Sequence, residues 1–181
     1  VELLREELKD HADEIRTDAM KNIIALKKGT QGENRPRVML AGHIDEIGFL
    51  IYNVDDKGFA SIAPVGGWMP GSIAGHTVKV HTRKGEVLTG VVSTHPALTP
   101  EAAAKAPEME KLFIDFGMPG DQVKEKVERG DWVTMDTRFQ ELGDCFVAKA
   151  FDDRVGAYII AEAFKKYENP SIDVYCVGTS Q

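Results

Sequence analysis

Two stretches of the chain carry apolar residues at helical spacing. From Leu3 to Ala12 they recur about once per turn with Glu and Lys between them, which predicts an amphipathic helix running to about Ile15. Residues 152–167 spread their apolar side chains over a wider arc. We therefore expect a second, mostly buried helix there.

Short apolar runs bounded by turn residues indicate strands. The segments "NIIALKKG" at 22–29, "PRVMLAGHIDEIGFLIYNV" at 36–54 and "IDVYCVGTS" at 172–180 are typical of buried strands. From Phe59 to about Gly143 the apolar segments are short and separated by Gly, Pro and Asp. This pattern of short apolar segments and turn residues predicts a separate small β unit.

The order of these elements predicts a split α/β domain that carries an inserted β module. With 181 residues, the chain is long enough for one domain or a nested pair. We expect residues 1–57 and 144–181 to form the α/β domain and residues 58–143 to form the insertion.

Composition narrows the range of partners and compartments. Lys and Arg number 22 against 29 Asp and Glu, a formal net charge of −7, which argues against a nucleic-acid or anionic-membrane surface. The chain has no long apolar run and no basic-then-apolar N-terminal segment, so we expect no membrane span and no targeting signal. Cys145 and Cys176 are the only cysteines and lack CxxC spacing, which favours a reducing compartment such as the cytoplasm.

The first candidate site is "AGHIDEIG", where an apolar strand leads into His43 and Asp45. Residues two apart on a strand face the same side, so these two side chains can share a pocket. One nitrogen of His43 could then bind a metal while Asp45 accepts the proton of the other nitrogen. The alternative is a histidine without function in a polar strand-to-loop transition, and the motif alone does not decide between them.

The second candidate is "AKAFDDRVGAY", where two acids open the second helix. Asp152 could be a plain N-cap with Arg154 as its surface partner. If Asp152 is the N-cap, the only role left for Asp153 is a favourable interaction with the helix dipole. A carboxylate at a junction of strand and helix is also a hard oxygen ligand that can bridge two divalent ions.

Taken together, "AGHIDEIGFLI", the insertion with "TRKGEVLTGVVSTHPALTP" and "KLFIDFG", and "AKAFDDRVGAY" followed by "VGTSQ" resemble the dimetal aminopeptidases of the glutamyl/deblocking aminopeptidase family. Members form large tetrahedral shells, and some are named endoglucanases. The resemblance covers nearly the whole chain. It implies a cytoplasmic metallo-aminopeptidase whose zinc-peptidase-like three-layer α/β/α domain is interrupted by a small β-barrel used for dimer and dodecamer assembly.

The resemblance also assigns roles to the candidate residues. His43 matches the first metal ligand, Asp45 the catalytic acid that orients it, and Asp152 the carboxylate that bridges two Zn²⁺ or Co²⁺ ions. Asp153 follows through an unusual peptide geometry and supports the site. Lys21 stands where the family usually has Gly.

In the family, the stretch after the position of Gln181 supplies a pair of glutamates, one a general base and one a metal ligand, and later an Asp and a His ligand. None of these four occurs here, so the resemblance implies that this chain is truncated and inactive as it stands. An intact version would cleave N-terminal residues from short peptides through a metal-activated water. Two alternatives stay open: a catalytically silent oligomerisation module, and a glycoside hydrolase, which needs two carboxylates flanking a sugar cleft.

Overall fold

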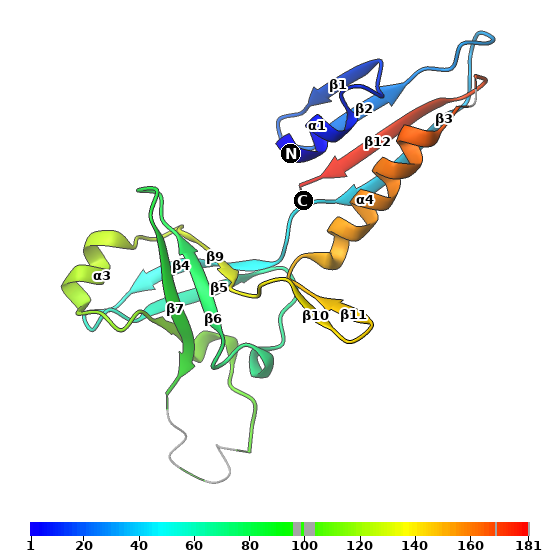
Figure 1. Cartoon of the computed structure of the whole chain (residues 1–181). Helices are drawn as coiled ribbons and strands as arrows, with labels where there is room; N and C mark the ends of the chain where they lie inside the picture. Colours follow the sequence, from blue (N-terminus) through cyan, green and yellow to red (C-terminus); the bar gives the residue numbers. More distant parts are fainter. Residues whose placement is uncertain (96–98, 100–103, 169, 181) are drawn as a thin grey trace. The chain divides into compact units, whose positions relative to one another are not determined.

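The computed structural model of the chain forms two compact units (Figure 1). It describes residues 1–95, 99, 104–168 and 170–180. The sheet unit comprises Val1–Glu46 and Ala148–Gln181, and the barrel unit comprises Ile47–Val147.

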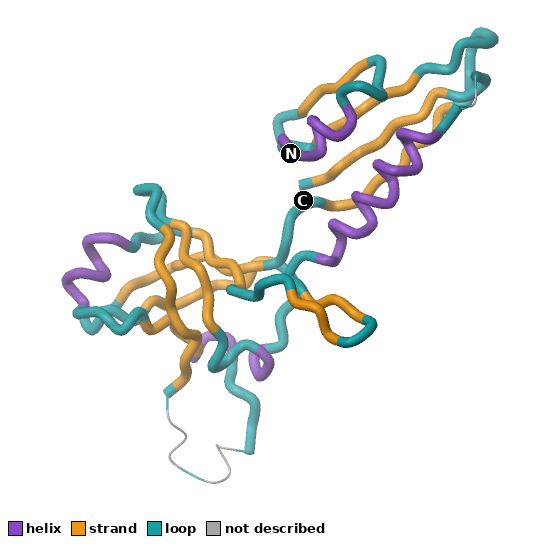
Figure 2. Tube along the Cα trace, viewed as in Figure 1, coloured by secondary structure: helices purple, strands orange, loops and turns teal. Residues whose placement is uncertain are grey.

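Figure 2 distinguishes the helices and strands of both units by colour. The elements of the sheet unit are α1 (Glu2–Leu8), β1 (Glu14–Thr17), β2 (Ile23–Lys27), β3 (Arg37–His43), α4 (Phe151–Lys166) and β12 (Asp173–Thr179). Those of the barrel unit are β4 (Gly48–Val54), β5 (Ala60–Val65), η1 (Pro70–Ser72), β6 (Thr77–His81), β7 (Val87–Thr94), η2 (Met109–Lys111), β8 (Leu112–Asp115), α3 (Gly120–Lys126), β9 (Trp132–Met135), β10 (Gln140–Leu142) and β11 (Cys145–Val147).

The sheet unit is built on four strands in the order β1-β2-β12-β3. β3 and β12 run parallel, and the other neighbours are antiparallel. The parallel register places Gly178 beside Gly42 and Thr179 beside His43. Because parallel neighbours point the same way, β12 ends beside the segment that follows β3.

Helices α1 and α4 cover one face of this sheet. Leu8 of α1 and Phe164 of α4 are fully buried in one apolar core with Ala25 of β2 and Cys176 of β12. The core explains why a helix seven residues long is stable here, since isolated helices of this length are not stable in water.

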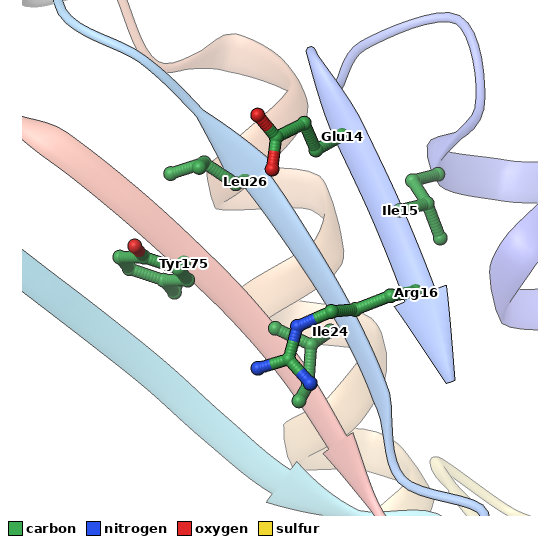
Figure 3. Close-up of a pocket in the computed structure, with 6 residues that line it drawn as sticks. All are labelled: Glu14, Ile15, Arg16, Ile24, Leu26 and Tyr175. Carbon is green, nitrogen blue, oxygen red and sulfur yellow. The ribbon is translucent and has the colours of Figure 1, made fainter. Parts of the chain in front are cut away.

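The other face of the sheet carries an open pocket of about 410 Å³ (Figure 3). Leu26 and Tyr175 are cross-strand partners one residue along from Ala25 and Cys176, so their side chains point away from the helices. The pocket is lined by Glu14, Ile15, Arg16, Ile24, Leu26 and Tyr175.

The N-terminal helix is shorter than its apolar spacing predicts. α1 ends at Leu8 rather than near Ile15, and residues Glu14–Thr17 form β1 against β2. Ile15 still packs against the core that contains Leu8, but it does so from a strand. Of the periodic apolar positions, Leu8 is buried whereas Leu3 is 86% exposed, and pairing with β2 decided the backbone conformation of Glu14–Thr17.

The C-terminal helix and β3 are less buried than expected. Ala161 and Phe164 of α4 are buried, whereas Tyr158 and Ile159 on the same helix are 65% and 58% exposed. β3 is an edge strand of the sheet, and its Met39 is exposed. The expectation of a mostly buried α4 is therefore wrong for the described residues, because only one side of its apolar arc meets the sheet.

Six strands close into a barrel in the order β4-β5-β8-β7-β6-β9. Alternate residues point inward: Val78 and Val80 of β6 are fully buried, and Lys79 between them is not. Trp68 lies against this core, where its ring stacks on Phe49 at 4.6 Å between centroids.

The barrel unit extends beyond the expected limits of residues 58–143. β4 pairs with both β5 and β9, so it closes the barrel instead of joining the α/β domain. The hairpin of β10 and β11 also belongs to this unit. The chain divides at 46/47 and 147/148 because, without β4, both β5 and β9 would keep an unpaired edge.

The two cysteines are expected to differ sharply in reactivity. Burial raises the pKa of the Cys176 thiol to about 11, and Cys145 is exposed. Because the thiolate is the nucleophile, a disulfide reagent at neutral pH should modify Cys145 rapidly and Cys176 only as the sheet unit opens. Both thiols should react rapidly in urea, and equal rates in the folded protein would contradict the burial of Cys176.

Candidate metal centre

His43 is the last residue of β3 and lies between two carboxylates. Its Nδ1 is 3.2 Å from Asp45 Oδ1, and its Nε2 is 3.0 Å from Asp152 Oδ1. The ring is 42% exposed, so it is accessible to an ion from solvent. In metal sites of proteins, a carboxylate on one ring nitrogen fixes the tautomer that presents the other nitrogen to the metal.

Asp152 and Asp153 serve different purposes at the start of α4. Asp153 Oδ1 accepts the backbone N–H of Gly156 at 3.1 Å, so this residue performs the capping considered for Asp152. The side chain of Asp152 is 95% exposed and faces His43. Both residues have non-helical dihedrals, and the peptide bond between them is cis.

The carboxylates around His43 raise its pKa. Desolvation, the largest single influence, lowers the pKa. The hydrogen bond with Asp152 and the negative charges of Asp45, Asp152 and Asp153 together outweigh it and hold the pKa above its ordinary value. The same negative field favours any cation at this position.

Glycine at position 42 lets α4 approach β3 closely at this site. A Cβ on Gly42 would lie 2.9 Å from the backbone nitrogen of Ala157 and 3.1 Å from Asp153 Oδ2. The strand that carries His43 therefore contacts the helix that follows Asp152 with no side chain between them.

Replacing Gly42 by Ala is expected to lower the free energy of unfolding by about 1–3 kcal/mol, because the added methyl group is overpacked against helix backbone. Urea unfolding followed by far-UV circular dichroism measures the change. Gly67→Ala is the matched control, since a Cβ there meets nothing within 4 Å. Equal midpoints for the two variants would show that β3 and α4 are not in close contact.

The remaining histidines do not join this cluster. His76, His81 and His95 belong to the barrel unit, where His81 Nε2 is 3.0 Å from Thr134 Oγ1. Within the described part of the chain, no group of three or more His, Cys, Asp or Glu side chains is arranged to hold a metal ion. His43 and Asp152 supply two donors, and a zinc site normally uses at least three protein ligands.

Reasoning from the sequence missed the residues that hold the loop after His43. Glu46 Oε1 lies 3.0 Å from Lys149 Nζ and 3.7 Å from Arg154 Nη2. The available signals were an acid just after the His-x-Asp motif and two basic residues flanking the Asp-Asp pair. No spacing rule connects positions so far apart in the sequence.

The turn before β2 forms although Lys21 replaces the usual glycine. Lys21 has a φ of 67°, a region that glycine enters without strain. The carboxylate of Asp18 accepts the N–H groups of Met20 and Asn22, both at 3.0 Å, and holds the turn. Asn22 Oδ1 in turn accepts the N–H of Ser180 at 2.8 Å, which anchors the residue after β12.

Comparison with known proteins gives consistent matches over the whole described fold. The sequence pattern of the M42 glutamyl aminopeptidase family matches residues 21–181. FrvX of Escherichia coli (strain K12) is 34% identical over 183 residues, which cover 98% of this chain and 50% of FrvX.

Two solved structures are also similar. Aminopeptidase APDkam598 from Desulfurococcus kamchatkensis has a TM-score of 0.90 at 36% identity, over 99% of this chain and 50% of that one. The Pyrococcus horikoshii TET1 peptidase, which can assemble into a tetrahedron or a large octahedral shell, has a TM-score of 0.81 at 30% identity, over 99% and 54%. The chain spans about half the length of the curated relatives it matches. It belongs to the M42 glutamyl aminopeptidase family.

Proposed function

We propose that this chain forms part of a metal-dependent aminopeptidase that removes N-terminal residues from short peptides. The observation that carries the proposal is the position of His43, with Asp45 on one ring nitrogen and Asp152 facing the other at 3.0 Å. Membership of the M42 glutamyl aminopeptidase family supports the reaction class.

The residues present fit a divalent ion in the chemistry of their donors. Imidazole nitrogen and carboxylate oxygen are ligands that Zn²⁺ and Co²⁺ accept. In this proposal Asp45 would accept the Nδ1 proton and leave the lone pair of His43 Nε2 for a metal, and Asp152 would supply carboxylate oxygen as a further ligand. The chemistry that such ions supply in a peptidase is activation of a water molecule and polarisation of the scissile carbonyl.

A complete site requires more than the described residues place here. At least one further protein ligand is needed. A general base must also take the proton from the attacking water and pass it to the leaving amine. The resemblance assigns these roles to a glutamate pair, an Asp and a His that follow the position of Gln181 in the family. The negative field of Asp45, Asp152 and Asp153 also suits the ammonium group of a free peptide N-terminus, which would account for exo-cleavage.

The barrel unit is proposed to mediate self-association into dimers and, through them, a dodecamer. Val87 of β7 and Trp132 of β9 both pair with His81 of the strand between them, and they are 58% and 56% exposed, as apolar residues at subunit contacts are. The similar TET1 peptidase assembles into large shells.

None of the described helices is long and apolar enough to cross a membrane. A cytoplasmic location is proposed on the two cysteines, which are free.

Peptide release tests the proposal. An M42 protein that carries these residues with the remaining ligands is stripped with a chelator and assayed with an aminoacyl p-nitroanilide before and after addition of Zn²⁺ or Co²⁺. Release is expected only with metal, and only from substrates with a free amino group. Metal-independent release of sugar from a glucan would favour a glycoside hydrolase. Assembly without metal binding or peptide release would favour a silent oligomerisation module.

A further inference from the structure

Residues 44–47, which follow His43 at the end of β3, have no regular secondary structure. Hydrogen bonds nevertheless hold this segment to β12 and to α4. The N–H of Ile44, the residue between His43 and Asp45, donates to the carbonyl oxygen of Thr179 at 2.8 Å. Arg154 Nε donates to the carbonyl oxygen of Ile44 at 2.9 Å. The backbone of Ile44 is thus held from β12 on one side and from α4 on the other.

A second set of contacts holds the end of the same segment. Glu46 Oε1 receives Lys149 Nζ at 3.0 Å and faces Arg154 Nη2 at 3.7 Å. Lys149 precedes Asp152 in the chain and Arg154 follows it. The Glu46 carboxylate therefore connects the residues on both sides of Asp152 to the segment after His43. The Glu46 side chain is only 17% exposed. Solvent and salt therefore screen its interactions with Lys149 and Arg154 less than they screen a pair of fully exposed side chains.

We propose that Arg154, Glu46 and Lys149 form a clamp that positions His43 against Asp152. This inference rests on the proposed metal centre. His43 and Asp152 come from separate elements, and their 3.0 Å separation depends on the path of both backbones. The clamp fixes both paths, and it touches neither ring nitrogen of His43, so its members are positioning residues.

The alternative is that these ion pairs only stabilise the fold. The chain offers a matched control for that alternative in Arg35, whose Nε donates to Asp173 Oδ1 at 2.7 Å. The Arg35 and Asp173 side chains are 24% and 14% exposed, against 52% and 17% for Arg154 and Glu46, so this pair is at least as buried. It lies in the same unit at the start of β12, and Thr179 at the opposite end of that strand pairs with His43. Arg35→Ala removes a comparable ion pair without touching residues 43–46.

The test uses the 181-residue chain and two readouts. Nitrogen-15 shifts of the His43 imidazole in the metal-free protein report whether Nδ1 and Nε2 keep their separate partners. Competition with a chromophoric chelator reports affinity for Zn²⁺. In Arg154→Ala and Glu46→Gln, the nitrogen-15 shifts of His43 are expected to move toward those of a ring that exchanges between its two tautomers. Both variants are also expected to bind Zn²⁺ about tenfold more weakly, or weaker still. Lys149→Arg, which keeps the charge, is expected to behave as the unaltered chain.

Arg35→Ala is expected to lower thermal stability while leaving both readouts unchanged. Glu46→Gln keeps nearly the same side-chain volume. If this variant folds and its His43 signals and Zn²⁺ affinity equal those of the unaltered chain, the clamp is overturned. If Arg154→Ala fails to fold, Glu46→Gln and Lys149→Ala decide the question. The metal-free His43 signals decide the clamp by themselves, because a complete zinc site needs at least one further protein ligand and Zn²⁺ affinity is only the second readout.

Discussion

Replacing His43 by Ala is expected to weaken Zn²⁺ binding by more than about 100-fold, since loss of a ligand exceeds the roughly 10–100-fold effect of losing an orienting partner. His43 Nε2 is the proposed nitrogen ligand in the cluster with Asp45 and Asp152, and carboxylates alone form a poorer zinc site. Competition with a chromophoric chelator measures the affinity in an M42 protein that carries these residues together with the remaining ligands.

Two variants control this result. His81→Ala removes an exposed histidine of the barrel unit whose Nε2 is 3.0 Å from Thr134 Oγ1, and it should leave Zn²⁺ binding unchanged. Asp45→Asn keeps the ligand but weakens its orientation, so its effect should fall within about 10–100-fold. Equal losses from His43→Ala and His81→Ala would mean that Zn²⁺ binds the chain at scattered histidines.

Replacing Phe164 by Ala is expected to lower the free energy of unfolding of the sheet unit by about 3–5 kcal/mol. Phe164 is fully buried in the core between the helices and the sheet, and its ring lies 5.0 Å from the Nζ of Lys27. Truncation leaves a cavity that α1, α4 and the sheet surround, so relaxation can fill it only in part. Urea unfolding followed by far-UV circular dichroism measures the loss.

Tyr158→Ala is the control for helix propensity and loss of an aromatic ring. Tyr158 lies on the same helix but is 65% exposed, so its replacement should change the free energy of unfolding by less than about 0.5 kcal/mol. A small effect of Phe164→Ala, equal to that of Tyr158→Ala, would show that the core of the sheet unit is not packed around Phe164.

The hydrophobic pattern predicted the strands of this protein better than the extent of its helices. The apolar run before His43 and the run "IDVYCVGTS" are β3 and β12, as expected. The helix expected to run to about Ile15 ends at Leu8, and Ile15 lies in a strand. The same spacing can satisfy a helix or a strand over so few residues, and the partner strand β2 decides between them.

The candidate site was predicted where its geometry is local. His43 and Asp45 are two residues apart, and the alternation of a strand was enough to expect both on one side. The residue pattern alone did not separate the functions of Asp152 and Asp153, because either acid can cap a helix; only the resemblance assigned the metal to Asp152. The bond from Gly156 N–H to Asp153 Oδ1 assigns the cap to Asp153 and leaves Asp152 facing His43.

By itself the sequence determined an α/β protein with an inserted β unit, and two short motifs with the chemistry of a metal site. Only the tertiary structure decided that β4 closes the barrel, that Gly42 admits Ala157 at close range, and that His43 meets Asp152 across 109 residues of chain. The reason is physical. Periodicity and turn chemistry act between neighbours along the chain, whereas strand order and close packing depend on segments that meet only in the folded state.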